Sequence, residues 1–179
     1  MTTAASPHAD WISALSPLIG RRLDALIWMP MISDTPQLVA EFEGPAFSFT
    51  GSVFLSFEGA SLILSWRQVG YEMVLDHGPR ASWGAHTLDR VRIAMNGAWT
   101  QVEGSVLKQL ELFTGPTMVD PEGEVMALRL ALENQTRRSH VWIGVGGPAG
   151  VFSMDDLWVA VDMDPPNRVD LSLLATVPA

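Results

Sequence analysis

The sequence contains no cysteine. Disulfides, thiolate metal sites and thiol nucleophiles are therefore excluded together, because each of them requires that side chain. Small secreted domains often depend on disulfides, so a chain without cysteine is more typical of a reducing compartment. We therefore expect a cytoplasmic location.

Basic residues are scarce, and Lys108 is the single lysine among eleven Lys and Arg residues. Twenty Asp and Glu residues give a formal net charge of -9. Because binding to a phosphate backbone depends on clustered cations, we do not expect a nucleic-acid partner. The basic pairs Arg21-Arg22 and Arg137-Arg138 are interpreted as solvated loop or edge residues, with a binding patch as the alternative. Solubility accounts for the acidity, and a basic partner is the alternative.

Long apolar runs are also missing. No stretch approaches the ~18–20 apolar residues that a membrane span needs, and the N-terminus lacks the basic start and apolar core of a secretory signal. The chain is nevertheless 47% hydrophobic and 179 residues long, which is enough to bury one core. We expect a single domain over residues 1–179 and no membrane partner.

Alternation of apolar and polar residues is the most frequent pattern, and this period is typical of strands with one buried face. The clearest case is residues 51–67, where two alternating segments flank Glu58-Gly59, a pair suited to a hairpin turn. Further strands are expected over residues 22–29, 38–42, 71–75, 91–95, 105–113, 125–132, 140–145 and 157–162. A short helix ending near Ser16 should follow the cap signal Ser6-Pro7. The sequence predicts an all-β fold, a sandwich or open barrel of mostly antiparallel strands with one short N-terminal helix.

The two halves of the chain, residues 18–75 and 104–162, have related spacing. Glycines and apolar residues recur at matching intervals: Gly20, Leu23 and Leu26 match Gly104, Leu107 and Leu110, and Val53, Leu55, Phe57 and Glu58 match Leu128, Leu130, Leu132 and Glu133. Trp66 is paired with Trp142 in this alignment. Chance matching of leucines is the alternative. A true internal repeat would give two similar sheets that share one core.

The glycine-led strand and hairpin of residues 51–66, repeated less closely over residues 128–142, resembles small bacterial β proteins that include some immunity proteins of toxin systems. The resemblance implies a half-buried hairpin, and no binding residue is carried over from it.

Catalytic patterns are weak. No two histidines have the spacing that lets one strand or one helical turn hold a metal. Asp76, His77 and His86 share a turn-rich segment and form a candidate metal site, and a solvent-exposed loop with two ordinary histidines is the favoured alternative. The glycine-rich residues 144–150 are followed by a strand pattern rather than a helix, so we interpret them as a connection between strands and not as a phosphate loop. We therefore expect no cofactor, and an enzyme is the less favoured class.

The functional candidates are Trp83, Trp99, His77 and His86. Both tryptophans stand among polar residues and glycine, where an exposed indole can anchor a partner. Partial burial under a loop is the alternative, and the favoured one. The leading hypothesis is a non-enzymatic protein-binding domain, with self-association included. The second is a sugar- or lipid-binding site between the sheets. The third is a metal-assisted enzyme that uses residues 76–89.

Overall fold

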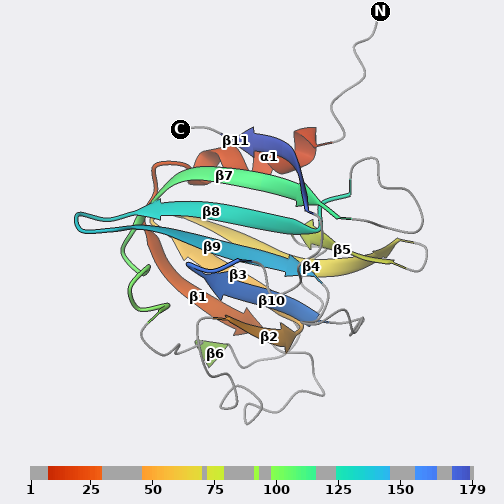
Figure 1. The fold of residues 1–179 in the computed structure, drawn as a ribbon, viewed down its shortest axis with the longest axis horizontal. Helices are drawn as coiled ribbons and strands as arrows, with labels where there is room; N and C mark the ends of the chain where they lie inside the picture. Colours follow the sequence, from red (N-terminus) through yellow and green to blue (C-terminus); the bar gives the residue numbers. More distant parts are fainter. Residues whose placement is uncertain are drawn as a thin grey trace, which may run out of the picture.

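The computed structural model describes residues 8–29, 46–69, 72–78, 91–92, 98–115, 124–145, 156–164 and 171–177. These residues form two antiparallel sheets that face each other, together with one short helix (Figure 1). The predicted all-β fold is confirmed. Within the described residues the two sheets form a sandwich-like arrangement that does not close into a barrel.

Sheet B contains the predicted central hairpin. Its strands, in spatial order, are β5 (Glu72–His77), β4 (Ala60–Val69), β3 (Ser52–Phe57), β1 (Leu23–Met29) and β6 (Val91–Arg92). The turn between β3 and β4 is Glu58-Gly59, as predicted, and Gly59 has a φ of 70°. Glycine suits this turn because positive φ is strained for residues with a Cβ atom.

Sheet A is built mostly from the second half of the chain. Its strands, in spatial order, are β11 (Ser172–Val177), β7 (Val106–Thr114), β8 (Ala127–Glu133), β9 (Arg138–Val145), β10 (Asp156–Val161) and β2 (Ala46–Thr50). Strand β2 is not among the predicted strands, which include residues 38–42 but not residues 46–50. That predicted strand lies outside the described residues.

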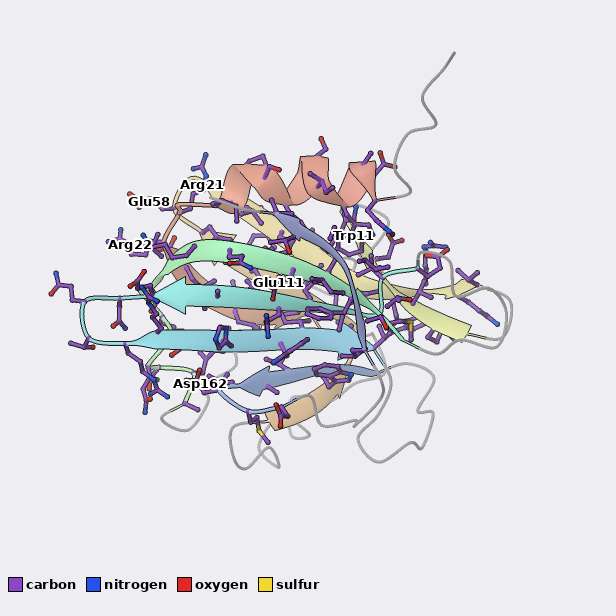
Figure 2. All side chains as sticks on the ribbon, turned by 45° about the horizontal axis from the view of Figure 1, so that its top comes forward. Trp11, Arg21, Arg22, Glu58, Glu111 and Asp162 are labelled. Carbon is purple, nitrogen blue, oxygen red and sulfur yellow. The ribbon has the colours of Figure 1, made fainter. Side chains whose placement is uncertain are left out.

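Helix α1 (Ala9–Leu15) continues into the 3₁₀ helix η1 (Ser16–Leu18), close to the predicted end of the helix. It lies beside β11 along one margin of the sandwich (Figures 1 and 2). Trp11, Leu15 and Leu18 are buried and belong to the core between the sheets. The predicted cap residues Ser6 and Pro7 lie outside the described residues, and His8 occupies the cap position.

The core is formed by the inward positions of both sheets, where alternation places Leu55, Leu64, Leu110, Leu130 and Val159 with no exposed surface. Burying each such aliphatic side chain contributes roughly 1.5–3 kcal/mol relative to leaving it in water. The alternation in the sequence thus determines which face of each sheet is internal.

Strands β1 and β3 of the first half pair in the same register as β7 and β8 of the second half. In sheet B, Ile27 pairs with Phe54, and in sheet A, Glu111 pairs with Arg129. The pairing of each set shifts by one residue at a corresponding place, between Leu23 and Ala25 in β1 and between residues 107 and 109 in β7. Positions in one sheet can therefore be compared with positions in the other.

The register does not support the alignment of Trp66 with Trp142. Val53 pairs with Leu64 and Leu128 pairs with Ile143, so Trp142 corresponds to Ile63 and not to Trp66. Trp66 belongs to the core between the sheets, whereas Trp142 lies on the outer side of sheet A. Aligning the two residues by type ignored the different lengths of the two hairpin turns.

Candidate functional site

Trp99 lies in the core between the sheets. Its side chain is 1% exposed, and its indole Nε1–H donates a hydrogen bond of 3.1 Å to Glu103 Oε1. The sequence favoured partial burial under a loop, whereas the structure buries Trp99 almost completely among core residues. The indole of Trp99 does not offer a surface to a partner. Trp83 and His86 lie outside the described residues.

His77 is the last residue of β5, whereas the sequence placed it in a loop that begins at Asp76. Its ring centre lies 4.2 Å from that of Trp11 in α1. Burial lowers the pKa of His77 below its usual 6.5, and the carboxylates of Asp76 and Asp10 offset part of that effect. The imidazole thus helps to hold α1 against sheet B.

Asp76 and His77 do not converge. Neighbouring residues of a strand point to opposite faces, and the Asp76 carboxylate lies 3.8 Å from Arg67 Nε, on the face away from Trp11. The two described members of the candidate metal site are thus on different faces of sheet B. Among the described residues, no group of three or more His, Cys, Asp or Glu is arranged to hold a metal ion.

A second apolar cluster lies on the outer side of sheet A. It contains Phe113, Ala127, Trp142, Trp158 and Ala160, all buried, with Leu171 packed against them. Trp142 and Trp158 are buried, but they belong to this outer cluster and not to the core between the sheets. The outer side of sheet A is therefore not an ordinary solvated face.

An ion pair lies on this outer cluster. Glu111, Arg129 and Trp142 form a row across β7, β8 and β9, because Glu111 pairs with Arg129 and Arg129 pairs with Trp142. Nε and Nη2 of Arg129 contact Glu111 Oε2, and Gln109 Nε2 donates a hydrogen bond of 3.0 Å to Glu111 Oε1. The Glu111 side chain is 10% exposed and that of Arg129 is 33% exposed. Figure 2 shows Glu111 over the middle of the sheet, away from the corner where Arg21, Arg22 and Glu58 lie.

The guanidinium of Arg129 stacks on two aromatic rings. Its central carbon lies 5.2 Å from the Trp142 ring centre and 5.6 Å from the Phe113 ring centre, and those rings are 4.8 Å apart. Cation–π contacts of this kind are worth ~0.5–2 kcal/mol, more when the cation is desolvated. Glu111 and the two rings thus fix the guanidinium in one orientation.

Exposed apolar surface adjoins the ion pair. Leu173 of β11 pairs with Phe113 and is 54% exposed. Thr176, also exposed, pairs with Glu111. Paired residues share a face of the sheet, so Leu173 lies on the same outer side as Phe113 and Arg129. We call the set Leu173, Phe113, Glu111, Arg129 and Trp142 the outer patch.

The corresponding row of sheet B is apolar. By the shared register, Glu111, Arg129 and Trp142 correspond to Ile27, Phe54 and Ile63. The same strand arrangement is therefore built without a charge in the other half of the molecule. Sheet B therefore forms this arrangement of strands with apolar residues at the three positions.

The outer patch combines an ion pair with aromatic and aliphatic side chains. A guanidinium held on aromatic rings presents directed hydrogen-bond donors beside apolar surface. The Glu111 carboxylate accepts hydrogen bonds from Gln109 and Arg129. The five residues of the outer patch include no second carboxylate and no imidazole that would complete an acid–base pair. The described residues of the outer patch thus place hydrogen-bonding groups and apolar surface side by side on sheet A.

Sequence reasoning missed the outer patch because polar residues at outward positions were interpreted as solvent-facing. One signal was available: Glu111, Arg129 and Trp142 all occupy outward positions of consecutive predicted strands. Their convergence depends on the register of those strands, which the sequence pattern does not fix.

No protein-family model, curated protein or solved structure matches the chain. In the part of the chain that the structure describes, no helix is long and apolar enough to cross a membrane.

Proposed function

We propose that the protein is a non-enzymatic binding domain whose partner is another protein, and that the partner docks on the outer patch. The supporting observation is the Glu111–Arg129 pair, which is largely removed from water at a position where the other sheet carries Ile27 and Phe54. Desolvating an ion pair is costly and often adds no stability compared with apolar residues. We therefore assign the Glu111–Arg129 pair to the binding of a partner and not to the stability of the fold.

The composition of the patch supports a protein as the partner. Binding energy in protein interfaces concentrates on Trp, Tyr and Arg residues that lie within an apolar surround. The guanidinium of Arg129 lies over the rings of Trp142 and Phe113, and one third of the Arg129 side chain is exposed. Leu173 offers exposed apolar surface beside it. A flat sheet face of this kind fits a protein better than a small ligand.

The small-ligand hypothesis has less support, because the described inward residues fill the space between the sheets with side chains that have almost no exposed surface. The metal-assisted hypothesis also has less support, because Asp76 and His77 lie on opposite faces of sheet B. A cytoplasmic location and the exclusion of nucleic acid stay predictions from composition.

Site-specific photo-crosslinking tests the proposal. The photoreactive residue p-benzoylphenylalanine replaces Leu173 in the full chain, in the cells that produce the protein, and the adducts are identified by mass spectrometry. The matched control places it at Ser61, an exposed residue on the outer side of sheet B. We expect a protein adduct from position 173 and not from position 61; equal adducts, or none at 173, contradict the proposal.

A variant built from the chain's own residues separates binding from folding. The double substitution Glu111→Ile and Arg129→Phe gives sheet A the residues that sheet B carries at the corresponding positions. We expect this variant to fold and to lose the adduct at position 173. Retention of the same adduct by the folded variant would show that the ion pair does not take part in binding.

A further inference from the structure

The first strands of the two halves meet at a corner where their hydrogen bonds are reciprocal. The N–H of Gly20 donates to the carbonyl of Leu107, and the N–H of Gly104 donates to the carbonyl of Leu23, both at 2.8 Å. The N–H of Leu107 donates to Arg21, and that of Leu23 donates to Ser105, again at 2.8 Å. Each bond becomes the other when the two halves are exchanged, which is the pattern of a two-fold axis.

The correspondence extends through each sheet. Strands β1, β3, β4 and β5 correspond in order to β7, β8, β9 and β10. The short strand β6 pairs with Ile27 and Trp28, and β11 pairs with the corresponding residues Glu111 and Leu112. The shared bulge and the shared outer strand are independent of the leucine spacing in the sequence.

Each half also lends the segment before its hairpin to the other half. Strand β2, directly before β3, pairs with β10 of the second half. Val125, shortly before β8, accepts a hydrogen bond of 2.8 Å from the N–H of Leu75 in β5 of the first half. Glu124 also lies 2.5 Å from Arg67 of β4. The corresponding strands β5 and β10 are thus each bonded to a segment from the other half.

We infer that the chain is an intramolecular dimer of two copies of one structural unit, residues 8–92 and 98–177, and that the surface of each unit is built to bind a second copy of that unit. The interface is homotypic, as in a two-fold symmetric dimer, where one patch serves both partners. It consists of the reciprocal corner, the exchanged segments and the shared core. The inference is independent of the outer patch and of any external partner.

Cleavage of the folded chain tests this inference. A protease recognition sequence inserted between Met95 and Asn96 divides the chain between the units. The cut halves are separated in urea, mixed and diluted, and followed by circular dichroism and by size-exclusion chromatography with light scattering. We expect most of the material to return to a one-to-one complex with the mass of the intact 19.5 kDa chain and with its β-sheet spectrum.

The matched control carries the same insertion between Gln135 and Thr136, in the β8–β9 turn, where the cut divides a unit. Its fragments should reassociate much less well, because the break point lies inside the second unit and not at a unit boundary. If the insertion at 95–96 itself prevents folding, residues 1–95 and 96–179 are co-expressed as separate chains, and a stable complex is expected. The inference is overturned if the halves do not reassociate, or if they do so no better than the control fragments.

Discussion

Gly20 and Gly104 hold the same backbone conformation on the two sides of the corner between the sheets. Their φ angles are 82° and 81°, and a Cβ atom added at either position would meet no atom within 4 Å. Glycine is therefore needed at each position for its positive φ, and not because other atoms approach closely. Because the two positions are equivalent, the same substitution should have the same effect at both.

Gly20→Ala and Gly104→Ala should each destabilise the protein by about 1–2 kcal/mol, the cost of a left-handed conformation for a residue with a Cβ atom. The two losses should agree closely. Urea denaturation followed by circular dichroism measures both. A large difference between them would show that the two sides of the corner are not under the same constraint.

Gly144→Ala should destabilise the protein for another reason. A Cβ atom at this position would lie 2.3 Å from the Trp158 indole, which covers the glycine and donates a hydrogen bond of 2.9 Å to the carbonyl of Val145. The backbone of Gly144 has no positive φ in the structure, so the cost is steric, and overpacking of this kind costs about 1–3 kcal/mol. Urea denaturation again measures it. The double variant Gly144→Ala with Trp158→Leu should show less than additive loss, and strict additivity would contradict the contact.

The ion pair of the outer patch should behave differently when one partner is removed and when both are replaced. Glu111→Gln should lower the free energy of unfolding by roughly 1–2 kcal/mol, because Arg129 keeps its charge but loses its carboxylate. The double variant Glu111→Ile with Arg129→Phe should be about as stable as the wild type. A thermal and urea denaturation series decides this, and a double variant less stable than the single one would mean that folding needs the pair.

His77 should make stability depend on pH. Burial lowers the pKa of His77 in the folded state, so the unfolded chain binds a proton more readily. Stability therefore rises with pH between the folded-state pKa and the unfolded value of 6.5. The contribution is complete above pH 6.5 and is lost as pH falls from there through the folded-state pKa. The charged groups that oppose the shift are Asp10 of α1 and Asp76 of β5.

His77→Phe keeps a ring against Trp11 and removes the titration, so its melting temperature should fall less between pH 7.5 and pH 5. Parallel melting curves of wild type and variant across that range provide the measurement. Identical pH profiles of the two proteins would exclude His77 as the responsible group.

Most strands were accessible from the sequence because alternation is a local property. The hairpin at Glu58-Gly59 and the strands near residues 22–29, 105–113 and 125–132 follow directly from it. The ends were less accurate: β5 extends to His77 because pairing of Leu64 with His77 continues the ladder beyond the last apolar residue. Strand β2 depends on β10, 106 or more positions away, and no local pattern contains that pairing.

The features of the candidate site also depend partly on local sequence and partly on pairing between distant strands. The sequence by itself determined the composition, the alternation and hence the internal face of each sheet, since these depend on neighbours along the chain. Only the tertiary structure decided that Trp99 is buried, that Asp76 and His77 face apart, and that Glu111, Arg129 and Trp142 form one row. Such a row joins residues from three strands, and its register is set by the bulge in β7 and by the turn between β8 and β9, where one residue more or fewer would send every side chain to the opposite face.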